Sequence, residues 1–485
     1  MSIATKHPSY IEAESMWDLV SDFTDGEQEV KAANDIYLPR LSGQTEPQYQ
    51  AIKNRTIFFP VTSKTCAGLL GAVFYKPPEV TLPLRISYLE QKATSDGSSM
   101  SDLATQVVKS LLEYGRVGLL VDRPADGGAP YLVVYDGDDI TNWDTQDTEK
   151  FIVLEEEIFV RDPKDKYSLE QQEQYRELML DANGEYIVNI HREVKDKKTR
   201  KNVWEIVDTI KPTKGGRPLT YIPFACASPD GLSFNIVKSP LYDLASVNWK
   251  HYMYSSSYSD AVHTLCFPTP WIAANLNNDN GTLTFNLGAK TAWVLPEGSQ
   301  VGFVEVDGKS LQHAENMLDR LEQTALSIGA RFVSQSKIST GVETAKGSEI
   351  RENQATEMLS SILVVTESLL NWGAKICAEW EGADPEEVSI KLNKDLVRSN
   401  LDANMVNALF GGYLKGTISA ETLYKNMNES NMYGIDNTFE KEFASIKKRM
   451  DEQAAAITKA AQDAMPPTDT GVVTPNLATQ NVNNA

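Results

Sequence analysis

Three aspartates in one tight turn are the first candidates for chemistry. Asp136, Asp138 and Asp139 form the sequence Asp-Gly-Asp-Asp between two apolar runs. Carboxylates at alternating positions can converge on a hard cation such as Ca²⁺, but the other ligands of a calcium loop are missing. Short polar turns of this kind usually connect strands in water. We therefore expect a solvated turn here and no metal site.

A second acidic group, Glu155, Glu156 and Glu157, lies inside the apolar stretch 151–160. Two carboxylates that flank a substrate can supply the general acid and base for glycoside hydrolysis. The sequence fixes no second carboxylate opposite this group. It therefore predicts only half of such a catalytic pair.

The segment from Gly341 to Ser348 contains the residues of a phosphate-binding loop with Lys346 and Gly347 transposed. In a working loop the glycine lets backbone N–H groups wrap the phosphates, and the lysine after it reaches over them. The transposition misplaces both groups, so we expect no nucleotide to bind.

Histidines and cysteines show no metal-binding or catalytic spacing. No HExxH, CxxC, GxSxG or strand-following GxGxxG motif occurs. We expect free, mostly buried thiols, structural or surface histidines, no cofactor, no metal and no enzymatic activity. The residues concerned are His7, His191, His251, His263, His313, Cys66, Cys226, Cys266 and Cys377.

The composition describes an acidic chain with enough apolar residues for a core. The 485 residues include 46 Lys and Arg against 67 Asp and Glu, for a net charge of −21, and 41% are hydrophobic. Such acidity disfavours a surface that grips nucleic acid by neutralising phosphates. The length allows about two to four domains. Without an apolar run of about 18 residues or a leader-like N-terminus, we expect no membrane span and a cytosol-like compartment.

Hydrophobic periodicity predicts an α+β region in the first 238 residues. Apolar positions at helical spacing occur at 10–20, 57–73 and 103–112, the last ending at Gly115. Runs typical of strands follow at 117–121, 131–135, 151–160, 186–192 and 202–210. The basic run 195–201 predicts a hairpin tip in water.

From Ser239 the pattern becomes helical over a long distance. Ser239 and Pro240 are a typical helix start, and one stripe continues to Leu265, about 39 Å at 1.5 Å per residue. A second helix is predicted between a cap at Ser310 and a stop at Gly329. Strand-like runs lie between the helices at 282–287, 291–295 and 301–306. This order predicts a two-helix stalk carrying a small β module, with a helical hairpin and long loop as the alternative.

The order of parts resembles the portal proteins of tailed bacteriophages, which are rings of subunits with wing, stem, clip and crown regions. Ser239-Pro-Leu-Tyr-Asp-Leu-Ala245 is similar to the start of the first stem helix, and Gly341 to Ser348 to the tunnel loop. Gly416-Thr-Ile-Ser-Ala-Glu-Thr422 is similar to a common portal C-terminal segment. Tyr37-Leu-Pro39, the helix from Phe58 to Gly71, and Gly115-Arg-Val-Gly-Leu-Leu-Val-Asp122 resemble a portal subgroup long known only as an uncharacterised phage family.

The resemblance implies an α+β portal fold with a helical and β wing, a two-helix stem carrying a small β clip, a long tunnel/wing helix and a helical crown. The implied parts are the wing at 1–238, first stem helix at 239–265, clip at 266–308, second stem helix at 309–330, tunnel loop region at 331–349, long helix at 350–384, crown at 385–465 and a disordered tail at 466–485.

The same resemblance implies a non-enzymatic ring of twelve subunits at one capsid vertex of the virion, made in the host cytoplasm. The ring would be the channel for genome packaging and DNA ejection and the attachment site for head-completion and tail proteins. Implied partners are other copies of the chain, double-stranded DNA without sequence specificity, the terminase large subunit, a head–tail adaptor, and major capsid and scaffolding proteins. A carboxylate-lined channel would repel DNA evenly and let it slide.

Three sets of residues receive roles from the resemblance. The channel set is Arg331, Lys337, Ser339, Thr340, Gly341 and Lys346. The clip set, for terminase or adaptor contact, is Trp271, Asn275, Phe285, Trp293 and Glu297. The stem-packing set is Leu244, Tyr254, Tyr258, Leu318 and Leu321.

Two other classes of protein remain open from the sequence. An acidic-cleft hydrolase would draw a carboxylate pair from Asp138, Asp139 and residues 155–157, which explains the acidity but not the stalk. A virion or scaffold protein could assemble through its helices without conducting DNA. A ring closed around an open channel separates a portal from that last class.

Overall fold

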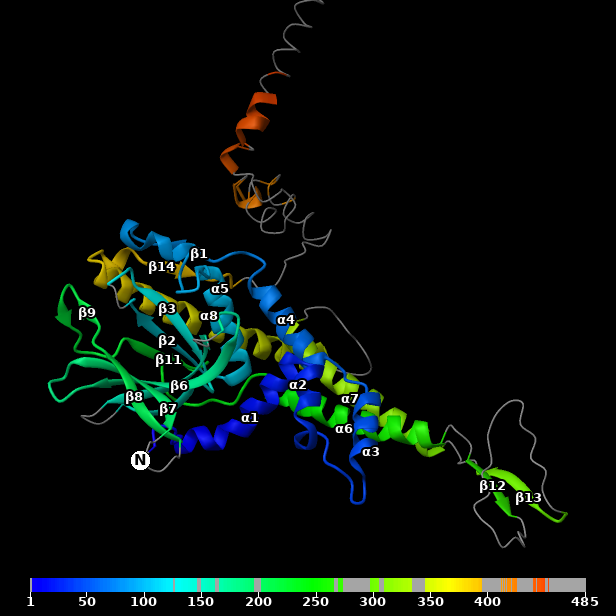
Figure 1. Ribbon diagram of the computed structural model, residues 1–485. Coiled ribbons are helices and arrows are strands. Elements are labelled where there is room, and N and C mark those ends of the chain that lie inside the picture. The colour runs from blue at the N-terminus through cyan, green and yellow to red at the C-terminus, as the bar shows by residue number, and fades with distance from the viewer. Residues whose placement is uncertain are drawn as a thin grey trace, which may run out of the picture. The chain divides into compact units, whose positions relative to one another are not determined.

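The protein is described by a computed structural model (Figure 1). It covers residues 2–124, 127–145, 150–161, 165–195, 202–265, 269–273, 297–304, 309–333, 345–394 and parts of 411–452. The chain forms two units, Met1–Leu396 and Val397–Ala485. Helices and sheets are mixed, which confirms the predicted α+β class. No helix in the described part of the chain is long and apolar enough to cross a membrane.

The first unit begins with helices whose ends follow local capping rules. Ser99 and Asp102 form a capping box at the start of α5, and Gly115 ends this helix in the left-handed conformation at φ 63°. The predicted helix and its glycine stop are therefore confirmed. The helices are α1 (Pro8–Asp25), α2 (Glu27–Ala32), η1 (Asn34–Ile36), α3 (Glu46–Arg55), α4 (Val61–Val73), η2 (Leu84–Glu90) and α5 (Met100–Tyr114).

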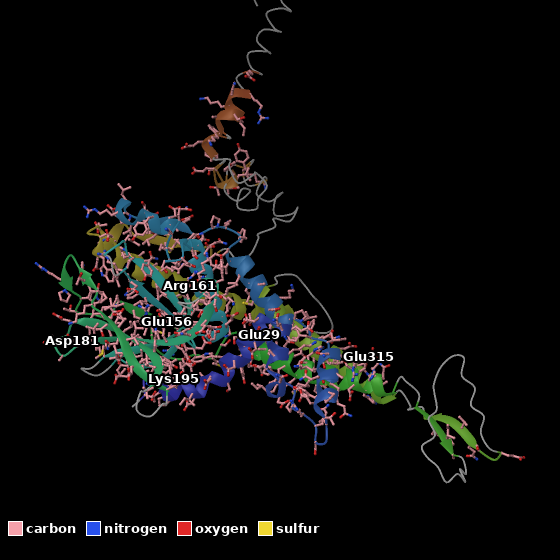
Figure 2. All side chains as sticks on the ribbon, viewed as in Figure 1. Glu29, Glu156, Arg161, Asp181, Lys195 and Glu315 are labelled. Atoms are coloured by element: carbon pink, nitrogen blue, oxygen red, sulfur yellow. The ribbon has the colours of Figure 1, made fainter. Side chains whose placement is uncertain are left out.

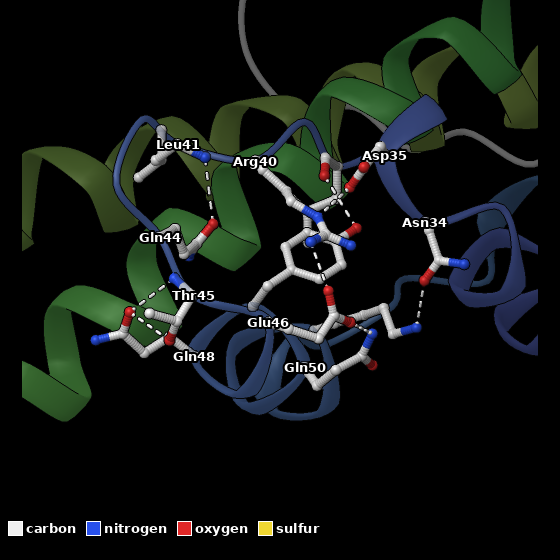
Figure 3. Close-up of polar contacts among 12 residues, drawn as sticks. Asn34, Asp35, Arg40, Leu41, Gln44, Thr45, Glu46, Gln48 and Gln50 are labelled. Carbon is white, nitrogen blue, oxygen red and sulfur yellow. Dashed lines mark hydrogen bonds and ion pairs between the residues drawn. The ribbon is translucent and has the colours of Figure 1, made fainter.

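A polar network fixes the turn into α3 (Figure 3). Thr45 and Gln48 form a capping box at its first turn. Arg40 lies 2.9 Å from Asp35 Oδ1 and 2.5 Å from Glu46 Oε2, so it joins the preceding segment to the helix. These contacts are local, and α3 also packs against the later helix α6.

Two antiparallel sheets follow. One has the order β11-β2-β3 and the other β4-β5-β6-β7-β8. Lys195 of β7 pairs with Asn202 of β8, so these strands form the predicted hairpin, although residues 196–201 lie outside the described residues. The strands are β2 (Val117–Asp122), β3 (Tyr131–Asp136), β4 (Ile140–Asp144), β5 (Phe151–Arg161), β6 (Leu169–Leu180), β7 (Tyr186–Lys195), β8 (Asn202–Ile210) and β11 (Phe224–Ala227). Short pairs are β1 (Glu79–Thr81) with β14 (Ser389–Lys391) and β9 (Thr213–Lys214) with β10 (Arg217–Pro218).

The remaining elements of this unit are α6 (Tyr242–Leu265), β12 (Thr269–Ala273), β13 (Gln300–Val304), α7 (Lys309–Val333), α8 (Ala345–Trp380) and η3 (Pro385–Glu387). Helix α6 begins three residues after the predicted start. Ser239 still acts there, because its Oγ accepts the Leu241 N–H at 3.2 Å and donates to Leu112 O at 3.0 Å. The first turn of α6 is thereby attached to the end of α5.

The core of this unit lies where α5 and α8 pack on the three-stranded sheet. Gly373 allows the close approach of α8, because a Cβ at this position would lie 2.8 Å from Leu119 Cδ2 and 2.9 Å from Leu132 Cδ2. Arg85 of η2 donates to Glu381 O at 2.7 Å and so satisfies a carbonyl beyond the end of α8. The long helix is therefore held at several points along the sheet body.

In the second unit the described residues include short helical pieces at 421–424 and 443–449. Ser419 Oγ accepts the Thr422 N–H at 3.0 Å, which confirms the capped start predicted there. The ring of Phe439 lies 5.6 Å from those of Tyr424 and Phe443. The predicted disordered tail lies outside the described residues.

Candidate functional site

Helices α6 and α7 form an antiparallel pair (Figure 1). Leu244 near the start of α6 clusters with Ala325 late in α7 and with Val61 of α4. One turn or two further along α6, His251 Nε2 lies 3.2 Å from Glu322 Oε1, which is earlier in α7. Residues further along α6 therefore contact residues earlier in α7, as antiparallel helices do. The chain that joins the helices, with β12 and β13, therefore starts and returns at one end of the pair.

Gly329 lies inside α7 and does not end it. The helix continues to Val333. A Cβ on Gly329 would lie 2.8 Å from Thr65 Oγ1 of α4, so the missing side chain lets the two helices approach closely. The predicted stop at Gly329 is wrong because a glycine in a helix can serve packing as well as termination.

Polar side chains attach α6 to the N-terminal helices along most of its length. Buried polar groups need partners, and here each bond crosses between segments far apart in the sequence. The contacts are Asn248 Nδ2 to Thr62 Oγ1 at 3.0 Å, Trp249 Nε1 to Tyr37 O at 2.9 Å, Ser255 Oγ to Ile57 O at 2.9 Å and Arg55 Nη2 to Asp260 Oδ1 at 3.1 Å. They hold the helix pair in a fixed direction relative to the N-terminal helices.

His251 is a buried part of this junction. Its ring packs at 5.2 Å from that of Phe59. Burial lowers the pKa of His251, while the hydrogen bond to Glu322 and the charge of that carboxylate act in the opposite direction. The lowered pKa favours the neutral ring at pH 7, as in the structural role predicted for this histidine.

Strands β12 and β13 pair with Trp271 opposite Gly302. A Cβ on Gly302 would lie 2.8 Å from Trp271 Nε1, so the indole lies across the glycine. Trp271 remains 41% exposed, and Glu297 is exposed. The other members of the clip set, Asn275, Phe285 and Trp293, and the predicted strands 282–287 and 291–295 lie outside the described residues.

The stem-packing set divides by burial. Leu244 and Leu321 are buried within their own chain, at 0% and 9% exposure, whereas Tyr258 and Leu318 are half-buried. Tyr254 is 44% exposed. Leu244 therefore packs within its own chain, whereas Tyr254 leaves a large part of its side chain accessible.

The channel set falls mostly between α7 and α8. Lys337, Ser339, Thr340 and Gly341 lie outside the described residues, while Arg331 is in the last turn of α7 and Lys346 in the first turn of α8. Because the backbone is helical from Ala345 onward, the second half of the transposed phosphate loop is helix.

The acidic turn after β3 is not the solvated connection that we predicted. Asp138 and Asp139 are only partly exposed, and Asp139 Oδ2 accepts the Asp136 N–H at 2.9 Å. Burial, with the charge of Asp136, raises the pKa of Asp138 to about 6. Burial, with the charges of Asp138 and Asp136, raises the pKa of Asp139 to about 8. Across the described residues, no three His, Cys, Asp or Glu side chains are placed to hold a metal ion.

Strand β6 supplies an acidic neighbour of Glu155, Glu173, that the sequence did not reveal. Burial, followed by a hydrogen bond to Glu173 and the charge of that group, raises the pKa of Glu155 to about 7. Glu173 is exposed, and in the strand register it lies opposite Glu157, while Glu155 lies opposite Tyr175. Burial and the acidic neighbour explain the raised pKa of Glu155, and this shift by itself assigns the residue no catalytic role.

Glu156, labelled in Figure 2, follows Glu155 on β5, so its side chain lies on the other face of the strand, where it joins an ion-pair network. Its carboxylate accepts from Tyr135 Oη at 2.6 Å, Gln174 Nε2 at 2.6 Å and Arg176 Nε at 2.7 Å. Arg176 also reaches Asp122 Oδ2 at 3.2 Å. These contacts assign Glu156 a structural role.

A groove of about 560 Å³ lies elsewhere, between α8 and the turn before Leu232. Its lining contains one carboxylate, Asp230, and none of the acidic residues considered for hydrolysis. The lining residues are Pro229, Asp230, Gly231, Leu232, Ser360, Ser361, Val364, Val365 and Ser368. The groove therefore gives no support to an acidic-cleft hydrolase.

Comparison with known families gives one match, to a domain of unknown function, DUF4055, over residues 240–381. This segment runs from the turn before α6 to the end of α8, so it contains the helix pair, both strands β12 and β13, and the long helix. No curated protein matches the chain.

Solved structures with similarity to the chain include parts of gene transfer agent particles, all at 13% identity. The virion of the native particle has a TM-score of 0.39 and coverage of 82% of this chain and 98% of the other. The neck of the native particle, computed with C12 symmetry, has a TM-score of 0.38 and coverage of 82% of this chain and 97% of the other. The neck of the empty particle, computed with C6 symmetry, has a TM-score of 0.41 and coverage of 80% of this chain and 95% of the other. TM-scores this low do not define a shared fold.

Proposed function

We propose that this chain is the subunit of a phage-type portal ring, a channel for double-stranded DNA at one vertex of a capsid. The observation that carries the proposal is the braced antiparallel helix pair α6–α7, with the strand pair β12–β13 in the connection at one end. A subunit of this kind can stand beside identical copies with its helices lining a tunnel. The family match over residues 240–381 covers the same elements.

The charge and the exposed groups are consistent with this role. A net charge of −21 per subunit repels the phosphate backbone, so DNA could pass through a ring without being captured. The exposed Trp271 on the strand pair is a suitable contact for a packaging motor or a tail adaptor, because aromatic side chains are enriched at interfaces. Arg331, Lys337 and Lys346 would then lie near the narrowest part of the channel.

Native mass spectrometry and negative-stain imaging of the purified protein test the proposal. Twelve copies of the 53.8 kDa chain have a mass of about 646 kDa. We expect rings with a central hole wide enough for duplex DNA. A chain that stays monomeric at high concentration contradicts the proposal, and a closed assembly with no channel favours a scaffold protein.

A pair of matched variants locates the contact between subunits. Tyr254, 44% exposed on α6, should lie in it, so Tyr254→Asp should reduce the ring fraction at least tenfold, the effect of about 1.4 kcal/mol per contact. Tyr167→Asp changes another exposed tyrosine, on the β5–β6 connection, and should leave the rings intact. Circular dichroism of both variants checks that they are folded. Equal ring fractions for the two variants would remove Tyr254 from the contact.

A further inference from the structure

Arg116 is a fully buried arginine with an unusual set of neighbours. It precedes β2 in the motif Gly115-Arg-Val-Gly-Leu-Leu-Val-Asp122, and its side chain has 0% exposure. The guanidinium carbon lies 4.0 Å from the ring centroid of Trp143 on β4. Its Nε donates to Cys226 Sγ of β11 at 3.3 Å. No carboxylate among the described residues pairs with it.

The two terminal nitrogens of Arg116, Nη1 and Nη2, have no acceptor within the described part of the chain. Other arginines of the same unit differ in this respect. Arg176, which is mostly buried, bonds to Glu156 and Asp122, and Arg123, which lies over the Trp380 ring at 5.8 Å, bonds to Glu381. Four N–H groups at one end of Arg116 therefore point to a missing acceptor.

The chemistry of the missing acceptor follows from charge. A buried guanidinium without a counter-charge is strongly destabilising, and contact with an aromatic face offsets only part of that cost. Water would accept the hydrogen bonds of the N–H groups but would leave the positive charge uncompensated. An anion would accept the hydrogen bonds and also neutralise the charge. Because the group is enclosed by its own chain, the anion must be small, and one positive charge calls for one negative charge.

Trp143 and His7 close the site on one side. The ring centroid of His7 lies 4.0 Å from that of Trp143 in a stacked arrangement, the same distance as the guanidinium, so the two groups occupy opposite faces of the indole. His7 Nδ1 accepts the Ser9 N–H at 3.2 Å and caps α1. The first turn of α1 thus forms the lid over the indole that covers Arg116.

We propose that Arg116 binds a monovalent anion of halide size, held by Nη1 and Nη2 behind Trp143. The anion is part of the folded subunit and neutralises the one buried arginine for which the described residues supply no carboxylate. The site lies away from α6 and α7, so a test of anion binding does not depend on whether the chain forms the proposed ring.

Thermal unfolding of the full chain in different sodium salts tests this site. At constant ionic strength, chloride and bromide should raise the Tm above its value in gluconate, which is too large to enter. Above saturation, each tenfold increase in halide should raise the folding equilibrium constant tenfold. Arg116→Met should abolish the dependence on halide. The matched control Arg123→Met, another arginine over an indole, should keep it.

A second measurement does not depend on any variant. Crystals of the unmodified protein grown in bromide should give an anomalous scattering peak within hydrogen-bond distance of Nη1 or Nη2 of Arg116. Equal Tm values in all three salts, together with no peak, would overturn the proposal and assign the acceptor to water or to a Cys226 thiolate. An equal halide effect in Arg116→Met would also overturn it, because the effect would then come from the protein surface.

Discussion

Replacing Glu156 with alanine removes the centre of the network between β3, β5 and β6. Three hydrogen bonds of 2.6–2.7 Å end at this carboxylate, and one of them comes from Arg176, whose side chain is only 18% exposed. Removing one partner of a buried ion pair leaves the other charge uncompensated, which costs about 3–5 kcal/mol. Since Arg176 keeps Asp122 at 3.2 Å, we expect the lower end of that range, about 3 kcal/mol.

The assay is thermal unfolding followed by calorimetry at pH 7. For a unit of the size of Met1–Leu396 the entropy of unfolding is roughly 0.8 kcal/mol per kelvin, so about 3 kcal/mol lowers the Tm by about 4 °C. Glu156→Gln keeps an acceptor oxygen and should lose roughly half as much. Glu157→Ala is the matched control, because this exposed neighbour makes one hydrogen bond, to Gln171 at 2.6 Å, and should cost about 0.5 kcal/mol or less.

A Glu156→Ala protein with an unchanged Tm would refute the structural role of this carboxylate. If that stable variant also lost a hydrolytic activity shown by the unmodified protein, Glu156 would be a catalytic residue. That result would contradict the proposal of a portal subunit. A portal subunit with the expected drop in Tm should still form rings at temperatures well below its transition.

Two further predictions concern packing and pH. Gly329→Ala should cost about 1 kcal/mol through its clash with Thr65 Oγ1, and adding Thr65→Ala should recover that loss; a double-mutant cycle by calorimetry with no coupling would show that α4 and α7 do not meet there. The pKa of Asp139 is about 8 in the folded chain, above its ordinary value. The protonated carboxyl group therefore stabilises the folded state fully below about pH 4, and this stabilisation is lost as the pH rises through 8. Asp139→Asn stays neutral, and its Tm relative to the unmodified protein should therefore rise between pH 5 and pH 9; a constant difference would show that Asp139 titrates normally.

Several elements could be predicted because their signals are local. The helix over residues 100–114 follows from its apolar spacing, and Gly115 ends it because a left-handed residue is needed there. Gly329 looked the same in the sequence but lies inside α7, since the reason for its presence is Thr65, which is over 260 residues away. Strand β6 was missed because its first half, Leu-Glu-Gln-Gln-Glu-Gln, has no apolar alternation.

Periodicity, capping and composition act over a few residues, so they were enough to predict most of the helices and strands, the long helical stripe after Ser239 and the acidic charge. The surroundings of the polar groups, by contrast, depend on contacts between distant parts of the chain. Glu173 on β6 raises the pKa of Glu155 on the neighbouring strand β5, and burial raises the pKa of Asp139. Arg116 contacts Cys226, which is 110 positions away, and pairs with no carboxylate among the described residues. The energy of a charge depends on which groups surround it in space, and that arrangement is set by long-range packing.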